Sequence, residues 1–209
     1  KEALTRSRNL ASINLMQSIG VDRAVKKLGE FGFKNVPPAL SVAIGSYGIS
    51  PLEYSTMYSM FPGLGITAKS KFIVSITDKD GKTRFIEPER RRVLRPEQAY
   101  LMTTLLKNIV QRGTGTRARV QGIDVAGKTG TSNDSIDAWF CGFTPDLQII
   151  IWYGNDDYKP MRKVEGGGRT AAPVFAKFLD AYLKEYPQTK RNFTVPDGVF
   201  SRQYNGKDE

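Results

Sequence analysis

Apolar residues recur at helical spacing in three segments of the chain, and capping signals mark two further helices. The clearest stripe follows Pro96 and stops at Gly113, which predicts a helix packed into a core. Asp22 is expected to cap a helix that ends before Gly32, and Ser50 is expected to cap the next one. The predicted helices cover 10–19, 23–31, 51–61, 96–112 and 170–185.

Shorter apolar and β-branched runs, bounded by turn residues, predict strands. Segments 72–77 and 83–87 flank a polar turn and are expected to form a β-hairpin. A second set is expected to pair as an antiparallel meander that leads into and follows Lys128. Its strands lie at 123–126, 138–143 and 148–153. The segment 187–209 is polar and broken by prolines, so we expect a tail or linker.

The composition excludes several classes of chemistry. With 209 residues, 40% hydrophobic and 25% charged, the chain can bury a core and is ordinary for a soluble globular protein. It has no histidine, which excludes a Ser-His-Asp triad, a Cys-His dyad and any histidine metal site. Its one cysteine, Cys141, excludes an intrachain disulfide.

The formal net charge is +10, and the basic residues form clusters. Such charge attracts nucleic acid, anionic lipid or an acidic polymer, but charge runs are usually solvated surface, which is the interpretation we favour. No nucleic-acid-binding motif accompanies the charge, so no nucleic-acid partner is expected. The clusters are Lys69 with Lys71, Arg90–Arg92 with Arg95, and Arg112 with Arg117 and Arg119.

The tetrad Lys128-Thr129-Gly130-Thr131 is the strongest candidate for chemistry. A lysine ammonium can stabilise an anion or assist a proton transfer, and two threonine hydroxyls can donate to a carboxylate. Gly130 lets a substrate backbone lie close to the strand, and the Thr131 amide is a candidate oxyanion donor. The alternative is a turn in which Gly130 only supplies backbone freedom.

A second candidate, Ser7-Arg8-Asn9, is weak when taken alone. Its alternative interpretation is a loop or helix cap, with Asn9 capping the helix predicted from Leu10. A Lys-Thr-Gly and a Ser-x-Asn are two of the three motifs of penicilloyl serine transferases. The third, Ser-x-x-Lys, is absent, because no serine in the chain has a lysine three residues later.

Four groups of residues stand in one order along the chain, which resembles the transpeptidase domain of class A, bifunctional penicillin-binding proteins. Two later stretches, 166–173 and 193–198, resemble the C-terminal part of the same family. The match covers nearly the whole chain. The ordered groups are Ser7-Arg8-Asn9-Leu10, Gly113-Thr114-Gly115, Lys128-Thr129-Gly130-Thr131 and Asp137–Pro145.

The resemblance implies an α+β fold of the transpeptidase and serine β-lactamase type, with an antiparallel sheet between helical layers. It also implies a D-Ala-D-Ala stem peptide of peptidoglycan as substrate, β-lactam antibiotics as covalent inhibitors, and no metal or organic cofactor. Ser7 would relay a proton to the leaving amine with help from Lys128, and Asn9 would hold the substrate amide. Thr129 and Thr131, beside Gly130, would bind the terminal carboxylate.

The chain departs from the family pattern because the nucleophile motif should precede Ser7. We therefore expect residues 1–186 to be the C-terminal portion of a transpeptidase domain, with the segment that carries the nucleophile elsewhere in the same protein. The parent protein would be anchored in the cell inner membrane, on the periplasmic side or the outer face, by a segment outside these residues. This chain alone should not be acylated.

Two residues near the tetrad have structural interpretations. Trp139 is expected to pack on the core or the sheet face rather than contact substrate, and Cys141 is expected to be an inert buried thiol. Two other functions stay open at this point. A serine β-lactamase or β-lactam sensor would share the tetrad, and a non-catalytic binding module would use the groove without a nucleophile.

Overall fold

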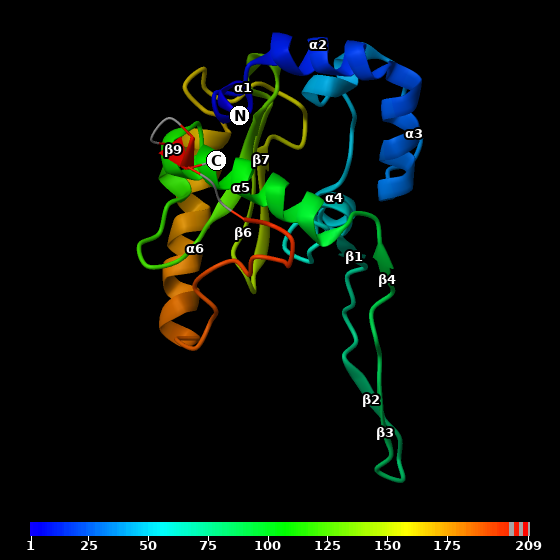
Figure 1. Ribbon diagram of the computed structural model, residues 1–209. Coiled ribbons are helices and arrows are strands. Elements are labelled where there is room, and N and C mark those ends of the chain that lie inside the picture. Colours follow the sequence, from blue (N-terminus) through cyan, green and yellow to red (C-terminus); the bar gives the residue numbers. More distant parts are fainter. Residues whose placement is uncertain (201–202, 205–206, 209) are drawn as a thin grey trace.

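A three-stranded antiparallel sheet forms the centre of the fold (Figure 1). The computed structural model describes residues 1–200, 203–204 and 207–208. The strands pair in the order β5-β6-β7, so β5 and β7 are the edges of this sheet. The predicted meander is thereby confirmed. Its strands are β5 (Ala126–Thr131), β6 (Asp137–Phe143) and β7 (Gln148–Gly154).

The first strand lies further along the chain than the prediction of 123–126. It begins at Ala126 and runs through the whole tetrad. Glycines weaken strand propensity, but here they let the two strands approach. A Cβ atom on Gly127 would lie 2.7 Å from the ring of Phe140. Packing against β6 therefore decides where β5 lies.

Two helices cover opposite faces of the sheet. Phe140 packs on Phe175 of α6 (Ala172–Glu185), with ring centroids 5.0 Å apart. Its neighbour Cys141 belongs to the cluster formed with Ile109 of α5 (Pro96–Arg112). Because neighbouring residues on a strand point to opposite faces, α5 and α6 lie on opposite sides. This confirms the expected α+β fold with an antiparallel sheet between helical layers.

The predicted helices all form, with shifted ends. α4 (Pro51–Tyr58) stops before Phe61, because the chain turns there through a compact loop. The Ser50 hydroxyl accepts from the amide of Glu53 at 3.2 Å, as a helix cap should. A π-helical turn, η4 (Gly167–Ala171), precedes α6, so the last α-helix begins at Ala172 rather than Thr170.

The N-terminal region extends away from the sheet (Figure 1). Short α1 (Glu2–Thr5) is followed by an arm, which we define as α2 (Asn9–Ile19), α3 (Val21–Phe31) and η1 (Leu40–Ile44). No residue of α3 is buried, and α2 buries only Met16. Asp22 lies in the first turn of α3 and is not its cap, which is Gly20. An acid there still interacts favourably with the positive helix end.

A narrow β-ribbon projects from the body of the molecule (Figure 1). The predicted hairpin forms but is shorter, with β2 (Ser75–Thr77) paired to β3 (Thr83–Phe85). At its base, β1 (Ile66–Ala68) pairs with β4 (Arg90–Arg92), a ladder that the sequence analysis missed. Arg91 donates to the carbonyl of Glu30 at 2.8 Å, so part of this basic cluster has a structural role.

The segment after α6 lies against the body of the protein. The amide of Asp124 donates to the carbonyl of Arg191 at 2.7 Å, and the ring of Phe193 lies 5.4 Å from that of Phe143. The predicted division of the chain into a domain portion, 1–186, and a tail or linker, 187–209, stays a prediction. Within the second part, residues 201–202, 205–206 and 209 lie outside the described residues. The remaining short elements are η2 (Thr116–Ala118), η3 (Asn133–Ser135), β8 (Gln203–Tyr204) and β9 (Lys207–Asp208).

Candidate active site

The structure brings the two halves of the predicted site together. Nζ of Lys128, on β5, donates to Oγ of Ser7 at 2.7 Å, although 121 positions separate the two residues. Docking of α1 on the end of α5 makes this contact possible. A Cβ atom on Gly113 would lie 2.4 Å from the carbonyl oxygen of Thr5, so only glycine allows this approach. The chain then turns at Ser7 with φ 54°, a conformation rare for residues other than glycine.

Burial makes the Lys128 ammonium more acidic. Desolvation lowers the pKa of its ammonium, which also donates to the carbonyl of Thr129 at 2.7 Å. Opposite it on β6 lies Cys141, which is buried, as expected. Burial raises the pKa of the Cys141 thiol to about 12, so the thiol is neutral at physiological pH. A lysine with a lowered pKa gives up a proton more readily than an exposed one.

Asn9 is the first helical residue of α2 and does not cap it. The cap position is Arg8, which makes no side-chain capping bond. The Asn9 side chain is exposed and has no hydrogen-bond partner among the residues that the structure describes. The alternative interpretation of Asn9 as a helix cap is therefore wrong, and its proposed contact with a substrate amide stays a prediction.

The two threonines of the tetrad lie on the face of β5 opposite to Lys128, because side chains alternate along a strand. Oγ1 of Thr129 lies 2.6 Å from Oγ1 of Thr114, and Oγ1 of Thr131 accepts from the amide of Gly167 at 3.1 Å. Since β5 is an edge of the sheet, groups from both of its faces can reach a ligand at that edge.

A glycine triplet holds these threonines in place. A Cβ atom on Gly166 would lie 3.0 Å from Oγ1 of Thr131. One on Gly167 would lie 2.1 Å from the carbonyl oxygen of Trp139. The triplet, which includes Gly168, thus packs directly on β5 and β6, where side chains would push it away.

Sequence reasoning missed the roles of Thr114 and Gly167 at this site. Both lie inside stretches that carried the family resemblance, Gly113–Gly115 and 166–173. In the structure the amides of the first stretch bond to neighbouring elements, with that of Gly115 donating to the carbonyl of Ile109 at 3.1 Å. The order of the glycine-rich stretches pointed to these residues, but order along the chain does not reveal which residues are in contact.

Trp139 packs among aromatic residues, as expected. Its ring lies 6.4 Å from that of Tyr54 on α4 and 6.5 Å from that of Trp152 on β7. These contacts fix the face of β6 next to Gly130. Packing therefore accounts for this tryptophan without a substrate contact.

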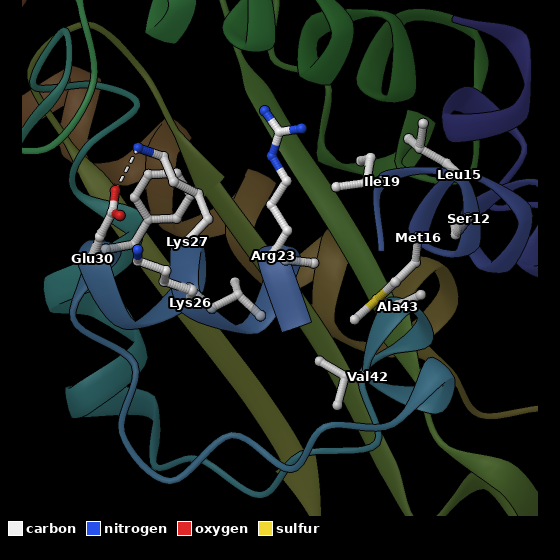
Figure 2. Close-up of a pocket in the computed structure, with 13 residues that line it drawn as sticks. Ser12, Leu15, Met16, Ile19, Arg23, Lys26, Lys27, Glu30, Val42 and Ala43 are labelled. Carbon is white, nitrogen blue, oxygen red and sulfur yellow. Dashed lines mark hydrogen bonds and ion pairs between the residues drawn. The ribbon is translucent and has the colours of Figure 1, made fainter. Parts of the chain in front are cut away.

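A large cavity lies away from these residues, in the arm. It has a volume of about 760 Å³ and lies between α2, α3 and η1. Figure 2 shows its lining, in which Leu15, Met16 and Val42 are apolar and the Lys27 ammonium pairs with the Glu30 carboxylate at 2.8 Å. None of the predicted site residues lines this cavity.

A lysine on an edge strand is bonded to a serine in the turn after α1, and two threonine hydroxyls lie on the other face of that strand. On a sheet between helical layers, this arrangement is typical of acyl-transfer enzymes. Comparison with known families agrees with this class. The model of the penicillin-binding protein transpeptidase domain matches residues 1–180, and the chain belongs to this family.

The chain is similar in sequence to penicillin-binding proteins 1A. It is 36% identical to penicillin-binding protein 1A of Neisseria meningitidis serogroup A over 210 residues, covering 96% of this chain and 26% of the relative. The chain therefore spans about a quarter of the length of that relative.

Solved structures share the fold. Penicillin-binding protein 1A from Haemophilus influenzae is 25% identical, with a TM-score of 0.87 over 99% of this chain and 38% of that one. Penicillin-binding protein 3 from Mycobacterium tuberculosis, solved with aztreonam, is 23% identical, with a TM-score of 0.74 over 88% of this chain and 51% of that one. The second likeness concerns the fold alone.

Proposed function

We propose that this chain supplies part of the active site of a peptidoglycan D,D-transpeptidase, which cross-links stem peptides through an acyl-enzyme. The observation that carries the proposal is the contact of 2.7 Å between Nζ of Lys128 and Oγ of Ser7. The nucleophilic serine comes from a Ser-x-x-Lys segment outside these 209 residues, since the chain itself has none. Membership of the transpeptidase domain family supports this reaction class.

In the first step, the nucleophilic serine gives its proton to the lysine of the Ser-x-x-Lys segment and attacks the carbonyl carbon of the penultimate D-Ala of a stem peptide, and the bond to the terminal D-Ala breaks. The leaving amine needs a proton. Because Lys128 donates to Oγ of Ser7, the hydroxyl hydrogen of Ser7 is available to that amine. The lowered pKa of Lys128 eases replacement of the proton that Ser7 gives away.

In the second step, an amine of a neighbouring stem peptide attacks the acyl-enzyme and releases the serine. Thr129 and Thr131 hold the carboxylate of the donor peptide in the first step, and Asn9 holds a substrate amide. A penicillin carries a carboxylate and a reactive amide, so it enters the same site and acylates the same serine. The name of the matched family, the penicillin-binding protein transpeptidase domain, supports this inhibitor class.

The parent protein works at the cell inner membrane, facing the periplasm, or on the outer face of the plasma membrane. The class A relatives support this location. No helix in the described part of the chain is long and apolar enough to cross a membrane.

Intact-protein mass spectrometry before and after incubation with penicillin tests the proposal. In the parent protein, one stable penicilloyl adduct is expected on the serine of the Ser-x-x-Lys segment, while the 209-residue chain alone stays unmodified. Fast release of the adduct, with rapid nitrocefin hydrolysis, would instead indicate a β-lactamase. A parent protein that never gains an adduct would contradict acyl-transfer chemistry at this site.

A further inference from the structure

The direction of the hydrogen bond to Thr131 is fixed by its partner. Its Oγ1 lies 3.1 Å from the amide nitrogen of Gly167, and a backbone N–H can only donate. Thr131 is therefore the acceptor in this bond, and its own hydroxyl hydrogen stays available. A carboxylate, which only accepts, can use that hydrogen.

Thr129 has a different kind of partner. Its Oγ1 lies 2.6 Å from Oγ1 of Thr114, and either oxygen can be the donor. A hydroxyl has a single hydrogen. If Thr129 donates to Thr114, it has nothing left to donate to a carboxylate. If Thr114 donates, the hydrogen of Thr129 stays free for a ligand.

We propose that Thr114 is a positioning residue, which donates to Thr129 and so directs the hydroxyl hydrogen of Thr129 toward the carboxylate of the stem peptide or β-lactam. This inference rests on the proposed function. An arriving carboxylate selects the arrangement in which Thr114 donates, because an anion stabilises donors that point at it. Hydrogen bonds in such a chain strengthen one another.

The backbone around Thr114 is held from two sides. The amide of Thr114 donates to the carbonyl of Thr5 at 3.4 Å. On the other side, a Cβ atom on Gly168 would lie 2.5 Å from the carbonyl oxygen of Thr114. Thr129 is itself buried, with 8% of its surface exposed, so it has little freedom to seek another partner. Packing therefore sets the Thr129 hydroxyl before a ligand binds, whereas the Thr114 side chain is exposed and is positioned through its backbone.

Two substitutions separate the hydroxyl of Thr114 from its shape. Thr114→Val keeps the shape and removes the donor, whereas Thr114→Ser keeps the hydroxyl. The matched control is Thr116→Val, two residues on in the same stretch, where the threonine is exposed. Each variant is made in the parent protein that contains the nucleophile, and second-order acylation rates are measured with a penicillin and with its methyl ester.

For Thr114→Val, we expect acylation by the free acid to fall about tenfold and acylation by the ester to change less than about twofold. Thr114→Ser and Thr116→Val should stay within about threefold of the unsubstituted protein on both compounds. Equal losses on acid and ester would mean that Thr114 only supports the fold, and an unchanged acid rate would mean that its hydrogen bond is not used. Either result overturns the inference.

The same assay distinguishes this inference from the proposed function. If the unsubstituted protein is not acylated by the free acid, the proposed function and the inference both fail. If it is acylated with a clear preference for the acid, and Thr114→Val keeps the whole preference, only the inference fails. Thr129→Val should lose at least as much of the preference as Thr114→Val, because Thr129 is the residue that touches the carboxylate.

Discussion

The sheet with α5 and α6 differs sharply from the arm formed by α2, α3 and η1. The sheet packs fully buried aromatic residues on both faces, whereas no residue of α3 is buried and Leu15 of α2 is 61% exposed. The site lies where these regions meet. Lys128, Thr129 and Thr131 are positioned by the core, whereas Ser7 lies in the turn between α1 and the arm, and Asn9 begins the arm. The two halves of the site therefore depend on packing to different degrees.

The largest effect is expected from Lys128→Ala, at the core side of the site. Removing the ammonium takes away the donor to Ser7, and β-lactam acylation of the parent protein should fall by about 10⁴-fold, the upper range for a lost proton-transfer partner. Acylation rates and circular dichroism measure activity and fold. Lys177→Ala, at an exposed position of α6, is the control. Unchanged labelling by Lys128→Ala would refute its role.

The next prediction compares how much a side chain in the core and a side chain in the arm contribute to the free energy of unfolding. Phe140 is fully buried between β6 and α6, so Phe140→Ala should lower the free energy of unfolding by about 3–5 kcal/mol. Leu15→Ala, in the exposed arm, should lower it by less than about 0.5 kcal/mol. Urea denaturation of this chain measures both. Similar losses at the two positions would show that the arm is packed as firmly as the sheet.

Ser7→Ala tests the arm side of the site. Acylation should fall by about 10²-fold, because the hydroxyl between Lys128 and the leaving group is gone. Ser7 has φ 54°, which strains serine and alanine alike because both carry a Cβ atom, so Ser7→Ala changes only the hydroxyl. Ser7→Gly removes both the hydroxyl and this strain and should lose about as much activity. A loss below about threefold in both variants would favour a role for Ser7 in the turn alone.

The smallest effect, counted per pH unit, concerns the buried thiol of the sheet. The pKa of Cys141 is raised by burial from 9.0 to about 12, so the folded chain keeps this proton when the unfolded chain has lost it. The resulting stability is present below pH 9 and is lost as the pH rises toward 12. Between these limits, the unsubstituted chain should lose about 1.4 kcal/mol per pH unit more than Cys141→Ala.

Urea titrations at several alkaline pH values, under reducing conditions, measure this difference. Subtracting the two proteins cancels the part of the Tyr54 and Tyr58 pKa shifts that comes from burial, and the remaining part reports the charge of Cys141 beside them. Parallel pH profiles of the two proteins would show that the thiol is not buried in solution.

Much of the fold follows from local sequence. The apolar stripe after Pro96, the Ser50 cap and the alternating residues of β6 and β7 each determine an element through contacts close along the chain. The ends of the helices and strands follow less closely from local sequence. Strand β5 was misplaced because its glycines have low strand propensity, and contacts with β6 explain their presence, Phe140 beside Gly127 and Trp139 beside Gly130.

The sequence by itself determined which chemical groups the chain has and, through their order, the family to which it belongs. Only the tertiary structure decided which groups meet. The bond between Lys128 and Ser7 spans 121 positions and depends on the close approach of Gly113 to Thr5. The bonds of Thr129 to Thr114 and of Thr131 to Gly167 likewise need three separate segments packed together. Local propensity has no term for such distant contacts, which are set by the packing of the whole domain.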